Sequence, residues 1–269
     1  MKIIKILKKA AVIGALALAI TLPVSVKAQS VFNGLKGPTK FQVDNRINYS
    51  TKEIPSGENV DSFTNNLIFK YWDGTNKGTF AFVNLPYKVI KSGEYNSSGI
   101  GDISLGIGPR FETKLKENKL GFLTYLGAVL PTGNKNSKPA LGTGRTDYKL
   151  GLFGTLLSES KKYEADMALD YTLTEGKGVS DEINAGLVLG GKVDDNLRLV
   201  AGPIINLKSG GKNDGDYTVN GRINVRYTPS GDIGKKMHFE LWYDHLLGYQ
   251  GKSSVKDGEA LTLVGRLNF

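Results

Sequence analysis

Segments in which apolar and polar residues alternate are the feature that most constrains the fold of this chain. In residues 259–269 the odd positions are almost all apolar, and most of the even positions are polar. Residues 163–173 alternate in the same way, with Met167 and Leu169 on one parity and Asp166 and Asp170 on the other. Because successive side chains of a strand point to opposite faces, each segment predicts a strand with one apolar and one polar face.

Twelve segments of this kind predict an all-β fold: a transmembrane, antiparallel, up-and-down β-barrel of about 12 strands over residues 39–269. Each segment has about the 9–11 residues that a tilted membrane strand needs, and single-chain bacterial barrels have an even number of strands. Residues 79–89 and 120–130 differ from the rest in being apolar on both faces. The predicted strands are 39–50, 62–72, 79–89, 100–112, 120–130, 145–156, 163–173, 182–192, 197–207, 217–228, 237–247 and 259–269.

A soluble β-sandwich would also show alternating strands. Aromatic residues favour the membrane barrel, because they bracket the apolar face of several segments: Phe41 and Tyr49 in one, Tyr163 and Tyr171 in another. Paired aromatics at both ends of an apolar face are typical of the girdles at the two membrane interfaces. A sandwich buries its apolar face in a core and has no reason to bracket it in this way.

The N-terminus predicts export. Residues 1–28 combine four lysines among the first nine residues, an apolar run from Ala10 to Leu22 and the sequence Val26-Lys27-Ala28, which is typical of a cleaved signal peptide. Removing its five lysines lowers the formal charge from +9 to about +4, so the basic balance indicates no nucleic-acid partner. Residues 29–38 are expected to form a short periplasmic segment before the barrel. The chain has no cysteine.

The connections between the predicted strands alternate in length. The links after the second, fourth, sixth and eighth strands are short, whereas most of the others are longer and rich in Gly, Ser, Lys and Asn, as in 131–144. Long outer loops and short periplasmic turns are typical of outer-membrane barrels. This pattern places both termini in the periplasm. The link Pro229–Lys236 is long for a periplasmic turn, and the pattern leaves open whether 131–144 folds inward.

The chain ends on an aromatic residue, Phe269. A final alternating strand that ends in Phe resembles the closing strand of bacterial outer-membrane β-barrels. The resemblance implies that Phe269 acts as an assembly signal and that the barrel-assembly machinery is a partner. It also implies that the protein is located in the outer membrane, with the lipid of that membrane around it.

If the apolar faces meet lipid, the opposite faces line a lumen rich in charges of both signs. Two interpretations stay open for these charges: a salt-bridged interior that holds the wall in shape, or a polar path for solutes. A few aromatic side chains also point inward, which suits an aromatic or aliphatic solute or packing against an inward-folded loop. The candidate lumen-lining residues are Arg46, Asp102, Arg110, Tyr125, Arg145, Phe153, Asp166, Arg222, Arg226, Trp242 and Arg266.

Three prolines, Pro86, Pro109 and Pro203, fall inside predicted strands. Each removes one hydrogen bond from the ladder, and a closed barrel has no edge strand that could accommodate them. Bulges or kinks are therefore expected at these positions. Because Pro86 and Pro109 lie on neighbouring strands, a sideways exit for a hydrophobic solute is one hypothesis for this part of the wall. A bulge without a role in transport is the alternative.

The sequence predicts neither an enzyme nor a cofactor protein. Its two histidines, His238 and His245, are seven residues apart on one predicted strand and so point to opposite faces. No serine pattern for nucleophilic catalysis accompanies them. No Cys/His cluster indicates a metal, and no strand, glycine-rich loop and helix together indicate a nucleotide. We therefore expect no catalytic residue, no metal and no cofactor.

Three stretches resemble one family. They are Phe82–Tyr87 (FVNLPY), Ser98–Gly106 (SGIGDISLG) and Leu130–Asn134 (LPTGN). Together they are similar to the "MetA-pathway of phenol degradation" family of outer-membrane transporters. The resemblance implies passive passage of small solutes, aromatic or hydrophobic ones among them, and it transfers no ligand residue. The alternative function is a closed structural or surface-interaction barrel that acts through its outer loops.

Overall fold

The computed structural model describes residues 40–53, 59–73, 77–176, 178–251 and 257–269. The predicted signal peptide, residues 1–28, and the predicted periplasmic segment, residues 29–38, lie outside these ranges. In the described ranges the elements are β1 (Phe41–Glu53), β2 (Asn59–Trp72), β3 (Lys77–Ser92), β4 (Tyr95–Ile100), β5 (Ile103–Leu115), β6 (Asn118–Leu130), β7 (Asp147–Leu157), β8 (Tyr163–Thr174), β9 (Asp181–Lys192), β10 (Leu197–Ser209), the 3₁₀ turn η1 (Gly211–Asn213), β11 (Tyr217–Tyr227), the short helix α2 (Gly231–Lys236), β12 (Met237–Gln250) and β13 (Asp257–Asn268).

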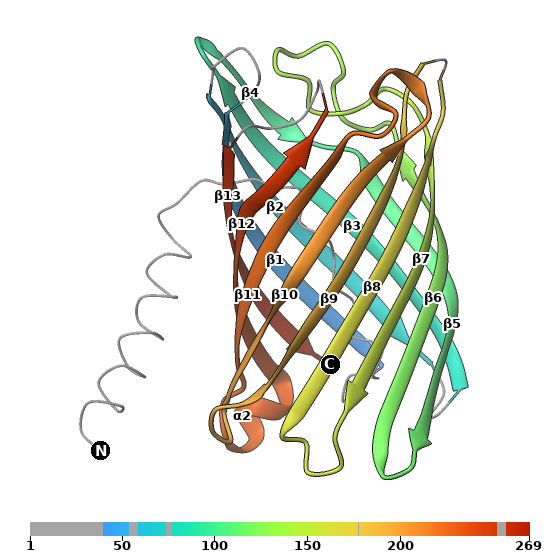
Figure 1. The fold of residues 1–269 in the computed structure, drawn as a ribbon, viewed down its shortest axis with the longest axis vertical. Helices are drawn as coiled ribbons and strands as arrows, with labels where there is room; N and C mark the ends of the chain where they lie inside the picture. Colours follow the sequence, from blue (N-terminus) through green and yellow to red (C-terminus); the bar gives the residue numbers. More distant parts are fainter. Residues whose placement is uncertain (1–39, 54–58, 74–76, 177, 252–256) are drawn as a thin grey trace, which may run out of the picture.

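Twelve of the described strands, all except β4, close into an antiparallel barrel (Figure 1), which confirms the predicted fold class. Each of them pairs with its neighbour in this series, and β1 also pairs with β13, so the first and last strands seal the wall. Closure pairs the backbone of every strand on both sides, which a membrane requires because lipid offers no hydrogen bonds. Among the described residues, no helix has the length and hydrophobicity needed to cross a membrane.

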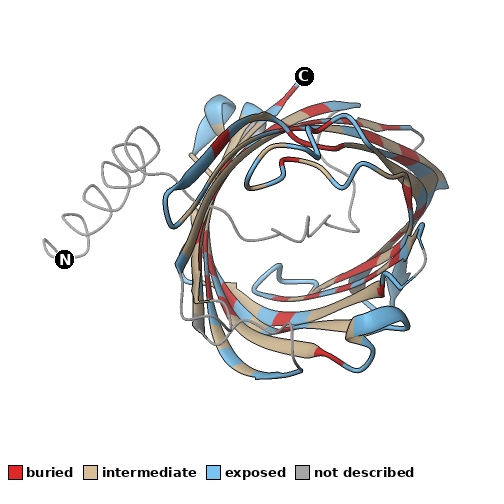
Figure 2. Ribbon diagram, turned by 90° about the horizontal axis from the view of Figure 1, so that it is seen from above, coloured by how far each residue is buried: buried red, intermediate tan, exposed pale blue. Residues whose placement is uncertain are grey.

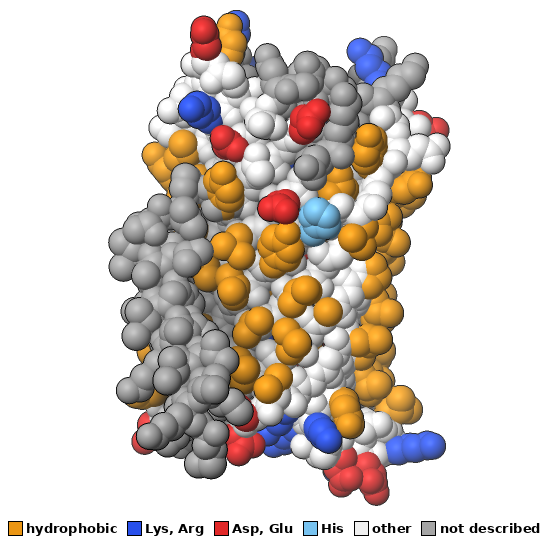
Figure 3. Space-filling view, turned by 60° about the vertical axis from the view of Figure 1, so that its left-hand side comes forward, with side chains coloured by type: hydrophobic (Ala, Val, Ile, Leu, Met, Phe, Trp, Pro, Cys, Tyr) orange, Lys and Arg blue, Asp and Glu red, His pale blue; other side chains and the backbone are white. Residues whose placement is uncertain are grey.

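The alternation in the sequence separates the outside of the wall from its interior. On β8, Tyr163, Met167 and Leu169 are exposed on the outer surface, whereas Asp166 and Asp170 are buried inside. The same separation holds around the barrel, so apolar side chains cover the middle of the wall (Figure 3) and charged ones gather at its two ends. The view along the barrel shows the strands as a ring around an interior (Figure 2).

The two ends of the barrel differ. The connections β5–β6, β7–β8 and β9–β10 are short, and β11–β12 contains α2; we call this the short-turn end. The opposite end, which we call the long-loop end, carries the connection 131–146 between β6 and β7 and the connection that contains η1. The long link Pro229–Lys236 is thus accounted for by a six-residue helix, α2.

The structure differs from the sequence prediction between β3 and β5. The predicted strand 100–112 is divided into β4 and β5, and residues 90–99 form a β3–β4 hairpin instead of an open loop. The division lies opposite Pro86. There Tyr87 pairs with Ile100 but Asn84 pairs with Ser104, so the β4–β5 side has one extra residue. An extra residue on one strand is a β-bulge.

The other two prolines interrupt the wall without a change of register. In the β5–β6 ladder residues 108 and 109 have no cross-strand partner, and in the β9–β10 ladder the same is true of residues 202 and 203. Both prolines follow a glycine, and the glycine is required by close approach of the neighbouring strand. A Cβ atom on Gly108 would collide with the backbone of Thr124 and Tyr125. A bulge is therefore found opposite Pro86, in the neighbouring strand, whereas Pro109 and Pro203 lie in gaps of the ladder.

Candidate functional site

A belt of buried side chains lines the interior toward the short-turn end of the barrel. Around one part of the circumference, from β2 to β7, it consists of aromatic rings, which we call the aromatic ladder. Around the rest it consists of charged groups, which we call the ion-pair network. The aromatic ladder is Trp72, Phe80, Phe82, Tyr125 and Phe153; the ion-pair network is Asp44, Arg46, Lys70, Glu164, Asp166, Arg198, Arg226, Glu240 and Arg266.

The aromatic ladder is a continuous series of ring contacts. Successive centroids are 4.6 Å apart between Trp72 and Phe80, 5.8 Å between Phe80 and Phe82, 5.0 Å between Phe82 and Tyr125, and 5.9 Å between Tyr125 and Phe153. These separations are favourable for ring pairs. Apolar Ile68, Leu123 and Ala168 pack with the rings.

Glycines make room for these rings. A Cβ atom on Gly106 of β5 would lie 2.8 Å from the Tyr125 ring, and Gly151 of β7 lies against the same ring from the other side. Because β5 carries Gly106 and Gly108 on its inner face, the rings of β3 and β6 meet across it. The Tyr125 hydroxyl donates a hydrogen bond of 2.8 Å to Asp170, which fixes the ring at the border with the charged side.

Asp44 of β1 is one centre of the ion-pair network. Its carboxylate accepts from Lys70 at 2.6 Å, from Arg46 at 2.9 Å and from Arg266 at 2.8 Å. Asp44 and Arg266 are direct cross-strand partners on β1 and β13, so these charges join the first and last strands inside the barrel. Arg266 continues the network to Glu240 of β12 at 3.5 Å.

Arg226 of β11 is the second centre, and three carboxylates surround it. Its guanidinium donates to Glu164 at 2.5 Å and to Asp166 at 2.9 Å, and it lies 3.6 Å from Glu240. Glu240 is its cross-strand neighbour, but Glu164 and Asp166 are on β8, and β9 and β10 lie between. Gly190, the β9 partner of Glu164, has no side chain to obstruct this contact. The network thus extends past two strands through the interior.

Trp242 lies beside this network, next to two arginines. The guanidinium carbon of Arg222 is 4.7 Å and that of Arg46 is 5.4 Å from its ring centroid, distances at which cation–π attraction operates. The indole N–H donates to Glu240 at 2.7 Å. Arg222 forms a two-point ion pair with Asp244, at 2.6 and 2.7 Å.

Two other predicted residues form ion pairs at different heights of the barrel. Arg110 pairs with Glu112 and lies 5.9 Å from the Trp72 ring, so it joins the aromatic side of the belt. Arg145 is half-buried at the long-loop end and pairs with Asp147 at 2.9 Å, away from the belt.

The last predicted residue, Asp102, lies between β4 and β5 at the long-loop end and holds the loop 131–146. Its carboxylate accepts from the backbone N–H of Gly133 at 2.9 Å and from the N–H and hydroxyl of Thr143 at 2.6 and 3.0 Å. Thr132 donates to Gly101 O and accepts from Ile103 N. We call this set of hydrogen bonds the clasp. It places Asp102 at the neck of the loop, at one end of the barrel.

The clasp joins all three stretches that carried the family resemblance. Gly101 and Asp102 come from Ser98–Gly106, Thr132 and Gly133 come from Leu130–Asn134, and Gly101 donates its N–H to the carbonyl of Pro86 at 2.8 Å. The loop also folds inward. Lys88, on the inner face of β3, donates to the carbonyl of Leu141 at 3.0 Å, and Leu141 is buried.

Sequence reasoning missed part of this site. The alternation indicated which side chains face inward, but it did not identify Lys70, Glu164 or Glu240 as members of one network. It also missed that Phe80 and Phe82 join the rings of β6. The glycines of β5 were the available signal, because a strand with glycine at successive inward positions leaves space for rings from its neighbours. Within the described residues, no group of His, Cys, Asp and Glu is arranged to bind a metal ion.

The fold and its lining define a class: a closed transmembrane β-barrel of the outer-membrane type with a charged and aromatic interior. Comparison with protein families gives a match to the family described as "MetA-pathway of phenol degradation" over residues 24–229. The chain belongs to this family, which confirms the resemblance seen in its sequence. A comparison with curated protein sequences gave no match.

Two solved structures with a similar fold are an outer membrane channel, COG4313, from Pseudomonas putida F1 and the NanC porin. The first has a TM-score of 0.71 at 16% sequence identity, covering 90% of this chain and 100% of that chain. The second has a TM-score of 0.51 at 9% identity, covering 84% of this chain and 100% of that chain. At these identities the similarity establishes the fold.

Proposed function

We propose that the protein is a passive outer-membrane channel for small solutes that carry an apolar, preferably aromatic, face. The observation that carries the proposal is the belt. A lumen built only for structural stability needs no continuous series of five rings on its inner wall, whereas a solute with a flat apolar face can stack on them. Such ring contacts contribute about 0.5–1.5 kcal/mol each beyond area burial.

The two sides of the belt suit different parts of such a solute. The aromatic ladder offers apolar contact, and the ion-pair network opposite offers hydrogen-bond donors and acceptors for a hydroxyl or carbonyl group. Because many belt side chains, including Phe153 and Arg46, are almost fully buried, passage requires some of them to move. The belt would then act as a selective constriction.

Beyond the belt, toward the long-loop end, the wall of the barrel also includes pairs of neutral polar side chains. Its inner face carries amide and hydroxyl pairs: Asn48 with Thr262 at 2.6 Å, Asn84 with Asn66 at 3.2 Å, and Asn206 with Asn184 at 2.5 Å. Neutral polar groups exchange hydrogen bonds with a passing solute at lower cost than fixed charges. The loop 131–146 folds inward at this end of the barrel.

The location and partners follow from the same proposal. The long loops face outward, the short turns face the periplasm, and outer-membrane lipid surrounds the apolar wall. The chain is exported by the signal peptide of residues 1–28, and the barrel-assembly machinery recognises the final strand that ends in Phe269. The fold shared with proteins described as a channel and a porin supports this assignment.

A closed structural barrel is the second candidate, and burial of the belt favours it. Asp44 is fully buried, and Arg46 and Phe153 are exposed by 1% or less, as in a packed core. In that case the long loops would carry the function, through a surface interaction.

The two tryptophans of the chain, Trp72 and Trp242, both lie at the belt and allow a direct test. We expect 4-bromophenol, a heavy-atom quencher, to quench the fluorescence of Trp72 saturably in a Trp242→Phe variant in vesicles. A brominated aliphatic alcohol should quench it less. Equal and linear quenching by both compounds, unchanged in Phe82→Ala, would contradict an aromatic solute site and leave the structural barrel.

A further inference from the structure

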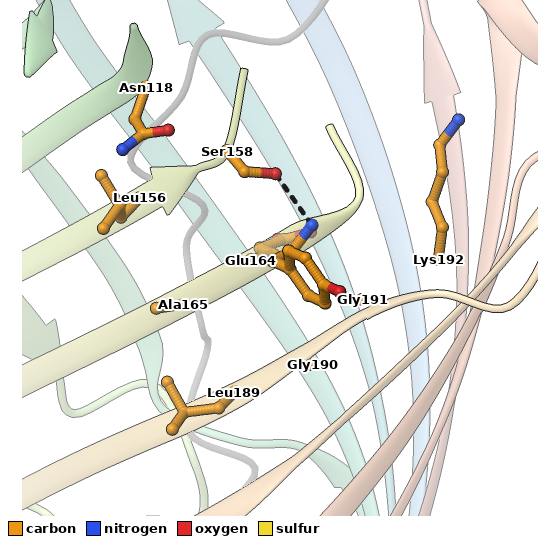
Figure 4. Close-up of a pocket in the computed structure, with 10 residues that line it drawn as sticks. Asn118, Leu156, Ser158, Glu164, Ala165, Leu189, Gly190, Gly191 and Lys192 are labelled. Atoms are coloured by element: carbon orange, nitrogen blue, oxygen red, sulfur yellow. Dashed lines mark hydrogen bonds between the residues drawn. The ribbon is translucent and has the colours of Figure 1, made fainter. Parts of the chain in front are cut away.

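The outer wall carries a second feature, a notch near the short-turn end between β7 and β9. On the lipid-facing surface Ala165 of β8 is the cross-strand partner of Leu156 on one side and of Leu189 on the other. The methyl group of alanine is shorter than the two leucine side chains, so a notch opens above it (Figure 4). The cavity has a volume of about 610 Å³, and Tyr163 and Gly191 form its end nearest the turn.

We infer that this notch holds an anionic phospholipid of the surrounding leaflet, with an acyl chain over Ala165 and the phosphate at the turn. The wall here faces lipid, since Leu189 and Tyr163 are 56% and 61% exposed on it. The acyl chain is therefore the natural occupant of an apolar recess in this surface. The inference is independent of transport and requires only that the barrel spans a membrane.

The charge at the turn selects the headgroup. Lys161 and Lys162 directly precede the cavity-lining Tyr163, and the Nζ atom of Lys162 is 5.3 Å from the centre of the Tyr163 ring. A tyrosine ring with a lysine beside it is typical of the headgroup level of a membrane. The neighbouring β5–β6 hairpin adds further basic residues. At the two turns and in the strand ends beside them lie Lys114, Lys116, Lys119, Lys161 and Lys162, against Glu117 and Glu159.

This excess of lysines complements a phosphodiester. A lysine near an anionic membrane surface contributes about 1 kcal/mol, which corresponds to about a five-fold change in affinity. Lys192, at the far edge of the cavity, is paired with Asp195 at 3.3 Å, so Lys161 and Lys162 are the cations offered to the phosphate.

The test is lipid retention by the refolded full-length barrel, measured by native mass spectrometry from mixed phosphatidylglycerol and phosphatidylcholine micelles. We expect the wild type to retain phosphatidylglycerol preferentially. The double variant Lys161→Ala/Lys162→Ala should lose about 25-fold in retention of this lipid, and Ala165→Phe, which fills the notch, should lose retention of both lipids.

Matched controls separate the notch from the rest of the wall. Ala185→Phe fills the space between Leu169 and Ile205 near the long-loop end, and Lys91→Ala/Lys212→Ala removes two cations there. Both controls should retain lipid as the wild type does. Equal retention of the two lipids by the wild type would overturn the headgroup assignment. Unchanged lipid retention by Ala165→Phe, in protein with heat-modifiable barrel migration, would overturn the assignment of the notch as the lipid site.

Discussion

Replacing Arg226 by leucine tests the ion-pair network, because it leaves one buried carboxylate, that of Asp166, without a cation. Three carboxylates surround this guanidinium, but two of them keep another cation when it is removed. Glu164 retains Arg198 at 2.9 Å, and Glu240 retains Arg266 at 3.5 Å. Asp166 keeps a hydrogen bond from Thr155 at 2.6 Å and loses its ion pair. The consequence of the substitution is therefore a buried carboxylate without a cation.

An unpaired charge of this kind costs about 3–5 kcal/mol, and we expect Arg226→Leu to lower the free energy of unfolding by that amount. Adding Asp166→Asn removes the unpaired charge, and the double variant should recover about 2–3 kcal/mol of the loss. The assay is urea unfolding in lipid vesicles, followed by tryptophan fluorescence. A loss below about 1 kcal/mol for Arg226→Leu, with no recovery from Asp166→Asn, would refute the reasoning.

Arg198→Ala is the matched control for this experiment. The Arg198 side chain is 21% exposed, and its partner Glu164 keeps Arg226 at 2.5 Å. Because no carboxylate is left without a cation, the loss should stay near 1 kcal/mol or below. A loss as large as that of Arg226→Leu would mean that the two arginines act as one unit rather than through Asp166.

Four further substitutions, one of them a control, test the clasp, the wall and the assembly signal. Asp102→Ala removes three hydrogen bonds from the neck of the loop 131–146. Protease cleavage within the loop should then become about 30-fold faster, which corresponds to about 2 kcal/mol. An unchanged cleavage rate would contradict the role of the clasp. Gly108→Ala should cost about 1–3 kcal/mol because its Cβ meets backbone, whereas Gly265→Ala, with open space around it, should be tolerated in the same unfolding assay. Phe269→Ala should reduce the amount of assembled barrel in outer membranes. A wild-type amount would contradict the prediction that Phe269 is an assembly signal.

Much of the fold was predictable because a barrel strand records its two environments in alternating residues. The alternation of Asp166 and Asp170 with Met167 and Leu169 needed no tertiary information to be assigned to inside and outside. The β3–β4 hairpin was missed because residues 90–99 are polar and rich in turn formers, so they indicate a loop. The bulge at Gly101 and Asp102 depends on Pro86 in the neighbouring strand, and a pattern within one segment cannot show it.

The site was less predictable than the fold. Alternation assigns a side chain to a face but gives no distance across the interior. Arg226 was expected inside, yet its contact with Glu164 depends on how the barrel brings β8 and β11 together. Likewise, Asp102 was expected to line the lumen, and the structure places it at the neck of a loop. The sequence motifs gave only part of the position of Asp102. They showed that residues 98–106 and 130–134 occur together in the family pattern, but they did not show that these two stretches contact each other.

The most direct test of the account is single-channel conductance of the refolded protein in a planar bilayer, with and without a small aromatic solute. We expect discrete conductance that the solute blocks, and a larger conductance with weaker block in Phe153→Ala, because this variant removes the last ring of the aromatic ladder. Absence of conductance in both proteins, with heat-modifiable barrel migration retained, would contradict a channel through the belt and favour a closed structural barrel.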